Sequence, residues 1–346
     1  MWRWVLPVAA VAAVLIGFLA SHNGPTGHVS SHPTPTTTTP PPSTTGTGLA
    51  AICGSRTGTP TVRHVIWIWF GSQGYNHLLG KVRIAPYINQ LSSQCGLASR
   101  YSSITHPAIA NDVGALAGDP HGLVHNACSP CTTSAASLLS QVHSWRAYVG
   151  GMPGPCRKLA APRSGYSRLS NPPTYLAVRG CRRFDVPLGS TTKGSLQRAL
   201  AANALPAFSL IVPDGCADTS FNKHCGGTPK RARFVARGDL WLHSWLGAIT
   251  SSAAYQSGST VIFVTWNQAV PAKPLGAGCT APNALPEACH VPLLVISPYV
   301  KAGLNVPTRF SHYSLLKATE KLLGARSLLG HAGDARAGDL AGAFGL

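Results

Sequence analysis

The sequence predicts an α/β protein built on a mostly parallel sheet. Four short apolar runs, rich in β-branched and aromatic residues, have the composition of strands buried on both faces: residues 63–70, 207–212, 260–266 and 291–297. Segments with helical patterning lie between and around them: residues 85–93, 196–202, 238–251 and 312–323. Strands and helices that alternate in this way are typical of parallel βαβ units.

Capping signals and charge support two of these helices. Ser311 has a side chain suited to an N-cap, and Gly324 suits the position that follows the last helical residue. Asp239 lies at the start of the run 238–251, where we expect it to interact with the positive end of that helix dipole. Residues 119–190, rich in Gly, Pro, Cys and Arg, are expected to form loops over the sheet.

The N-terminal part of the chain differs in composition from the rest. Residues 4–20 form a continuous apolar run after Arg3, which is typical of either a signal peptide or an N-terminal membrane anchor. A tract rich in Pro, Thr, Ser and Gly follows and predicts a disordered linker. We therefore expect a signal peptide or anchor at 1–22, a linker at 23–49 and a folded domain at 50–346. Both alternatives predict export, as a secreted protein or as one anchored in the cell membrane and facing outside.

Cysteine number and charge agree with export. Ten cysteines, an even number, favour disulfides formed in an oxidising compartment. Sequence neighbours suggest five pairs, although spacing does not determine connectivity: Cys53/Cys95, Cys128/Cys131, Cys156/Cys181, Cys216/Cys225 and Cys279/Cys289. A zinc site at the Cys128/Cys131 pair is less favoured, because no second pair follows at zinc-finger spacing.

The chain is strongly basic, with 28 Lys and Arg against 10 Asp and Glu and a formal net charge of +18. Such a charge favours anionic partners, and for an exported protein these are phospholipid headgroups or polyanions of the cell envelope. A solvated basic surface without a specific partner explains the same charge and is the favoured alternative. Nucleic acid is not expected as a partner, because the chain carries an export signal and no recognisable reader motif.

A polar dipeptide, Asn267-Gln268, follows the apolar run 260–266. In open α/β sheets, functional residues gather at the carboxyl ends of strands, so this dipeptide marks a candidate site. Asn and Gln have the shapes of Asp and Glu without the negative charges that hard cations require of their ligands. Gly71 and Ser72 occupy the corresponding place after the run 63–70.

The segments at these positions resemble the bacterial phosphoesterase family of acid phosphatases and phospholipases C, within the alkaline phosphatase-like superfamily. The resemblance extends from His64 to Leu346, and it rests on six segments: 64–76, 85–89, 105–111, 238–245, 266–268 and 309–316. It implies an α/β/α sandwich and a metal-dependent reaction that passes through a covalent phosphoryl intermediate.

The positions that carry the family reaction are altered in this chain. Where the family has Glu-Asn after the first strand, the chain has Gly71-Ser72, and Ala108 replaces the nucleophilic Ser or Thr. Where the family has Asp-Glu after a later strand, the chain has Asn267-Gln268. Ala108 has no oxygen to attack phosphorus, and the site lacks three anionic metal ligands. The resemblance therefore predicts a family member with no catalytic residue at these positions, no bound metal and no other cofactor.

Five further residues match positions near the site in the family and define a predicted residual pocket: Asn111, Asp214, Asp218, His290 and His312. Each also has a structural explanation that the sequence leaves open. Asn111 can bond its own loop, His312 can belong to the first turn of its helix, and the two Asp can stabilise a turn.

Three functional hypotheses follow. The first is an exported pseudoenzyme that binds or scaffolds at the cell envelope and recognises an anionic envelope component or a phosphate-containing ligand. The second is an active hydrolase whose divalent metal is held by a rebuilt site of His290, His312, Asp214 and Asp218. The third is a basic module that adheres to anionic lipids or wall polymers.

Overall fold

The computed structural model describes residues 52–346, except 128–130, 221, 226–229, 271–278 and 280–284. The predicted segments 1–22 and 23–49 lie outside the described residues. The folded unit spans Gly46–Leu346. No helix among the described residues is both long and apolar enough to cross a bilayer.

The described part of the folded unit contains one sheet of eight strands, in the order β4-β3-β5-β1-β6-β7-β2-β8. The strands are β1 (His64–Phe70), β2 (Gly96–Ser102), β3 (Trp145–Val149), β4 (Asp185–Pro187), β5 (Phe208–Val212), β6 (Thr260–Trp266), β7 (Leu293–Ile296) and β8 (Asn305–Ser311). Only β7 runs antiparallel to its neighbours β6 and β2. The other pairs are parallel, which confirms the predicted fold class.

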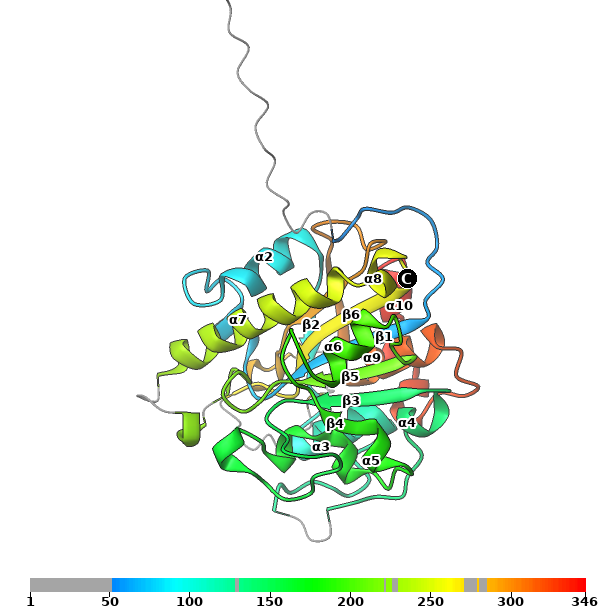
Figure 1. Ribbon diagram of the computed structural model, residues 1–346. Helices are drawn as coiled ribbons and strands as arrows, with labels where there is room; N and C mark the ends of the chain where they lie inside the picture. Colours follow the sequence, from blue (N-terminus) through cyan, green and yellow to red (C-terminus); the bar gives the residue numbers. More distant parts are fainter. Residues whose placement is uncertain (1–51, 128–130, 221, 226–229, 271–278, 280–284) are drawn as a thin grey trace, which may run out of the picture. The chain divides into compact units, whose positions relative to one another are not determined.

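Helices cover both faces of the sheet (Figure 1). They are α1 (Tyr75–Leu78), α2 (Pro86–Gln94), α3 (Ala108–Ala117), α4 (Leu138–Gln141), α5 (Cys181–Phe184), α6 (Ser195–Ala201), α7 (Arg231–Thr250), α8 (Ala253–Gln256), α9 (His312–Leu322) and α10 (Leu340–Ala343). Helix α7 packs with α2, α6 and α8, whereas α9 packs with α3 and α10.

Side chains of strand β1 pack against the helices on both faces of the sheet. Side chains alternate across a strand, so Trp67 and Trp69 face one layer and Phe70 faces the other. The indole of Trp67 donates to Thr319 in α9, whereas the ring of Phe70 packs edge-on against Trp241 in α7. All three β1 residues are almost fully buried, which explains why the strand is apolar throughout.

The predicted strands correspond to β1, β5, β6 and β7, and the predicted helices to α2, α6, α7 and α9. Strands β2, β3, β4 and β8 were not predicted. Strands β3 and β4 belong to residues 119–190, for which we expected loops, and together they extend the sheet beyond β5. Strand β8 lies at the edge, where only some of its side chains are buried, so an apolar run could not reveal it.

The N-cap prediction for Ser311 and the helix-dipole prediction for Asp239 had different outcomes. Ser311 is the N-cap of α9 and accepts a hydrogen bond from the Tyr313 amide, as predicted. Asp239 does not lie at a helix start, because α7 begins at Arg231. Its buried carboxylate instead accepts hydrogen bonds from the amides of Tyr87 (3.1 Å) and Ile88 (2.8 Å). Asp239 therefore caps the N-terminus of α2, a partner that tertiary packing brings to it.

Four of the five predicted disulfides are present: Cys53–Cys95, Cys156–Cys181, Cys216–Cys225 and Cys279–Cys289. The fifth predicted pair includes Cys128, which lies outside the described residues. The first of these bridges joins the chain before β1 to the residue after α2.

Candidate functional site

A pocket of about 460 Å³ lies where β1 and β6 end. The two strands are parallel neighbours with Phe70 opposite Trp266, so the residues that follow them lie side by side. The amide of Asn267 donates to the carbonyl of Phe70 at 2.9 Å and continues the pairing beyond the strands. Gly71, Ser72, Ala108, Asn267 and Gln268 all line this pocket. The five positions at which the chain departs from the family pattern therefore converge.

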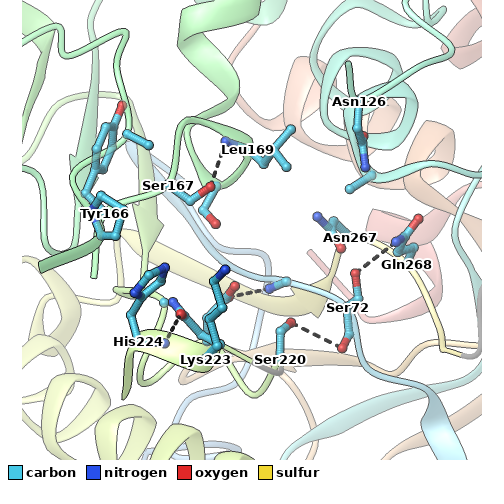
Figure 2. Close-up of a pocket in the computed structure, with 18 residues that line it drawn as sticks. Ser72, Asn126, Tyr166, Ser167, Leu169, Ser220, Lys223, His224, Asn267 and Gln268 are labelled. Carbon is cyan, nitrogen blue, oxygen red and sulfur yellow. Dashed lines mark hydrogen bonds between the residues drawn. The ribbon is translucent and has the colours of Figure 1, made fainter. Parts of the chain in front are cut away.

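The opposite wall comes from parts of the chain that sequence reasoning did not connect with the site. Tyr166, Ser167, Lys223 and His224 line it together with the main chain around Gly215. Figure 2 shows Lys223 and His224 across the pocket from Asn267 and Gln268. Lys223 and His224 therefore bring basic groups to a pocket whose facing residues, Asn267 and Gln268, are neutral amides.

The side chain of Gln268 is engaged within the protein. Its Nε2 donates to Ser72 Oγ at 2.9 Å, and its Oε1 lies 3.0 Å from Nδ1 of His106 (Figure 2 shows the bond to Ser72). The other ring nitrogen of His106 lies 2.8 Å from the carbonyl oxygen of Ala288. Both ends of the Gln268 amide therefore have partners that hold it in place.

Asn267 contacts a buried carboxylate that the sequence analysis missed. Its Nδ2 lies 3.4 Å from Oδ1 of Asp112, and the same oxygen accepts a hydrogen bond from the indole of Trp69 at 2.8 Å. Asp112 is 1% exposed, and its Oδ2 has no partner among the described residues. Burial raises the pKa of Asp112 to about 7, against the two hydrogen bonds that lower it. The one sequence signal for Asp112 is its position as the only charged residue in the apolar segment 108–117.

His312 supports Asn267 from the side away from the pocket. Its Nε2 lies 2.9 Å from the carbonyl oxygen of Asn267, and its Nδ1 lies 2.8 Å from the hydroxyl of Tyr101. Burial lowers the pKa of His312 to about 4, so the ring is neutral at physiological pH. A neutral ring with the proton on Nε2 donates to Asn267 and accepts from Tyr101, which satisfies both contacts.

Gly71 and Asp218 are in direct contact. Oδ1 of Asp218 accepts a hydrogen bond from the Gly71 amide at 2.5 Å. A Cβ atom at position 71 would overlap Oδ2 of Asp218 and the hydroxyl of Ser220. Burial raises the pKa of Asp218 well above its ordinary value, and the nearby charges of Asp112 and Asp214 act in the same direction. Because residue 71 is a glycine, the Asp218 carboxyl group can occupy the space that a side chain at this position would need.

Asp218 is the only one of the five predicted residual-pocket residues among those that line the pocket. Asn111 braces its own loop, since its Oδ1 accepts from the amides of Ile104 and Thr105. Asp214 accepts from the amide of Cys216 and stabilises the turn that the Cys216–Cys225 bridge closes.

His290 also lies apart from the pocket lining. Its Nε2 lies 2.9 Å from the carbonyl oxygen of Ser99 in β2, and its ring stacks on Tyr75 with 4.0 Å between centroids. Burial is the largest of the causes that lower its pKa. The structure therefore does not bring His290, His312, Asp214 and Asp218 together around one point.

The family resemblance implies a divalent metal, and the donor groups at this pocket do not fit one. Among the described residues that line it, Asp218 supplies the one carboxyl group, whose Oδ1 is bonded to the Gly71 amide. Gln268 is held by Ser72 and His106. Hard divalent cations take several anionic oxygen ligands, and this pocket offers one. The described residues also contain one cluster of potential ligands, His106 with Cys279 and Cys289, but those two cysteines form a disulfide.

A parallel-sheet α/β/α sandwich with a pocket at the ends of β1 and β6 defines the class, which is the fold of the alkaline phosphatase superfamily. A protein of that superfamily from Vibrio parahaemolyticus matches with a TM-score of 0.53 at 13% identity, covering 82% of this chain and 72% of that one. The lipoteichoic acid synthase LtaP from Listeria monocytogenes matches with a TM-score of 0.52 at 12% identity, covering 82% of this chain and 77% of that one. At these identities the matches establish the fold alone.

The sequence comparisons give the family. The model of the Phosphoesterase family matches residues 79–325, so this chain belongs to the phosphoesterase family, as the resemblance predicted. A phosphatidylinositol-3-phosphatase from Mycobacterium tuberculosis is 24% identical over 288 residues, which are 80% of each chain.

Proposed function

We propose that this chain is an exported member of the phosphoesterase family that binds a phosphate-containing ligand without hydrolysing it. On this proposal it acts at the cell envelope as a binding or scaffolding pseudoenzyme. The observation that carries the proposal is the convergence of Gly71, Ala108, Asn267 and Gln268 in one pocket. These four differences from the family pattern all concern one site, and they affect two steps of one reaction, the nucleophilic attack and the binding of a metal.

The absence of hydrolysis follows from what these side chains lack. A methyl group at Ala108 cannot form the covalent phosphoryl intermediate. Gly71 has no side chain, and the amides of Asn267 and Gln268 are neutral, so these positions supply no anionic ligand that would hold a cation to offset phosphoryl charge in the transition state. The hydrogen bonds of Gln268 to Ser72 and His106 stabilise the site in this neutral form.

Ligand binding is supported by the opposite wall. Lys223 and His224 place positive or hydrogen-bonding groups in the pocket, and Ser167 adds a hydroxyl. The raised pKa of Asp218 favours its neutral form, which repels an anion less than a carboxylate would. The relative from Mycobacterium tuberculosis is named as a phosphatase of a phosphorylated lipid, which is consistent with a phosphate ester as the ligand class.

Export and the envelope location rest on other features. The four disulfides suit an oxidising compartment. The net charge of +18 suits an anionic envelope partner. The signal peptide or anchor at 1–22 and the absence of a nucleic-acid partner remain predictions from the sequence.

The two alternatives are distinguishable. An active hydrolase with a rebuilt metal site gains no support from the geometry, because His290 bonds to Ser99 and both nitrogens of His312 are engaged. A basic adhesion module would bind anionic vesicles with an affinity that falls steeply as salt is raised, and without using the pocket.

Two measurements on the purified full-length protein, kept in detergent, test the proposal. We expect no hydrolysis of p-nitrophenyl phosphate with Mg²⁺, Ca²⁺, Mn²⁺ or Zn²⁺ added, and calorimetric binding of inositol 1-phosphate that Lys223→Gln weakens. Arg326→Gln, at a basic residue that does not line the pocket, is the matched control and should bind as the unaltered protein does. Turnover at rates typical of phosphatases would contradict the proposal. An affinity for inositol 1-phosphate that Lys223→Gln leaves unchanged would also contradict it.

A further inference from the structure

A second cavity adjoins the pocket that contains Asn267 and Gln268. It measures about 510 Å³ and is lined by Ser72, Gln73, Thr219, Ser220, Arg231, Phe234 and Val270. Ser72 and Ser220 line both cavities. The hydroxyl of Ser220 donates to the carbonyl oxygen of Ser72 at 3.3 Å, a bond that Figure 2 shows, so these two residues form a common wall.

The two cavities differ in the basic residue that each provides. Lys223 and His224 line the first cavity and not the second, whereas Arg231 lines the second and not the first. One phosphate group is too small to occupy both cavities. The arrangement therefore suits a ligand with two separated anionic groups.

Arg231 is available to such a ligand. It is exposed and makes no ion pair within the described part of the chain. Its positive charge acts on the nearby His77. Burial is the largest cause that lowers the pKa of His77, and the charge of Arg231 is the next. Guanidinium groups recognise phosphate by paired hydrogen bonds in a planar geometry.

The local helix adds to the positive character of the second cavity. Arg231 is the first residue of the 20-residue helix α7, whose N-cap residue Lys230 makes no side-chain capping bond. The positive end of the helix dipole favours an anion at this position. Phe234, in the first turn, and Val270 give the cavity apolar walls, which suit the carbon skeleton between two phosphates.

We propose that the cavity at Arg231 is a second anion subsite, and that the ligand is a polyol carrying two phosphate groups. One phosphate lies with Lys223 and His224, the polyol passes the wall of Ser72 and Ser220, and the second phosphate meets Arg231. This inference rests on the proposed function and narrows the class of ligand that the pocket binds. The same chemistry occurs in a soluble polyol bisphosphate and in the headgroup of a phosphorylated inositol lipid.

The test compares ligands that share one ring and differ in phosphate number. Calorimetry on the full-length protein would measure inositol 1-phosphate against inositol 1,3- and 1,4-bisphosphate. We expect at least one bisphosphate to bind about tenfold more tightly or better, because a second charge-assisted contact forms. Arg231→Gln should abolish that gain and leave the affinity for the monophosphate unchanged.

Arg233→Gln is the matched control, because Arg233 is an exposed arginine of the same helix that lines neither cavity. It should keep the full gain. Equal affinity for mono- and bisphosphate, or a gain that survives Arg231→Gln, would overturn the second subsite while leaving the proposed function intact. Failure of every inositol phosphate to bind would instead overturn both.

Vesicles separate the two sources of the ligand. Vesicles with phosphatidylinositol 3-phosphate, compared with vesicles of phosphatidylinositol, present the second phosphate on a membrane. Preferential binding that Arg231→Gln removes would assign the lipid headgroup. The tenfold gain in solution, without any preference between vesicles, would assign a free bisphosphate, and both results uphold the subsite.

Discussion

Replacing Asp112 by Asn should change how the stability of this protein depends on pH. The native state holds a proton on Asp112 up to about pH 7, whereas the unfolded chain releases it near the ordinary value of 3.8. The contribution of Asp112 to the free energy of unfolding is therefore highest on the acid side and falls as pH rises from about 4 to about 7. A difference of about 3 pH units corresponds to about 4 kcal/mol.

The amide that Asp112→Asn introduces would be neutral at every pH and would keep an oxygen for the donors Trp69 and Asn267. We expect the variant to lose this part of the pH dependence. At pH 8 it should be more stable than the unaltered protein, by up to about 4 kcal/mol. At about pH 4 the two should differ little, within about 2 kcal/mol, because both then carry a neutral group at this position.

Urea unfolding at a series of pH values, with the disulfides intact, measures this difference directly. Glu320, with a pKa that burial raises to about 7, and Asp185, with one raised to about 6, also titrate in this range. Their contributions cancel when the variant is subtracted from the unaltered protein. Leu240→Gln, at an exposed position that carries no titratable group, is the control for the effect of substitution itself and should leave the slope unchanged. A slope in Asp112→Asn equal to that of the unaltered protein would refute the reasoning.

Three further predictions concern the site and its support. Gly71→Ala should lower the free energy of unfolding by about 1–3 kcal/mol, because its Cβ would overlap Asp218, and adding Asp218→Ala should recover much of the loss in the same urea assay. Ala108→Ser should not create phosphatase activity towards p-nitrophenyl phosphate, since a hydroxyl alone restores neither metal nor base; measurable turnover would show that the remaining site is competent. Replacing both Cys53 and Cys95 by Ser should cost about 2–4 kcal/mol in thermal or urea unfolding, and an unchanged midpoint would show that the bridge contributes nothing.

The central strands could be predicted because their surroundings impose a simple pattern. β1 and β6 are buried on both faces, so every position in them is apolar or nearly so, and such runs are visible in the sequence. β2, β3 and β8 contain arginines whose side chains reach more exposed surroundings, so their pattern is mixed. Which strands lie at the edge of the sheet depends on which strands pair with one another. This pairing joins segments that are far apart in the sequence, so a local pattern does not reveal it.

The same distinction applies to the site. The residue types at 71, 72, 108, 267 and 268 can be compared with the family pattern from the sequence alone, and that comparison predicted that the groups of the family reaction are missing. Their convergence required β1 and β6 to be adjacent and in register, which is a property of the sheet.

The partners of these positions were decided only by the tertiary structure. Asp112 lies behind Asn267, and Asp218 occupies the space beside Gly71, although the two pairs are separated by 155 and 147 positions in the sequence. The shift in the pKa of both carboxyl groups comes mainly from burial, which depends on everything packed around them. The sequence therefore determined which residue types stand at positions 267 and 268, and the resemblance predicted from them that anionic ligands of the family are missing there. Only the packed fold determined which groups now surround that dipeptide, because desolvation and contact are properties of the assembled interior rather than of any local segment.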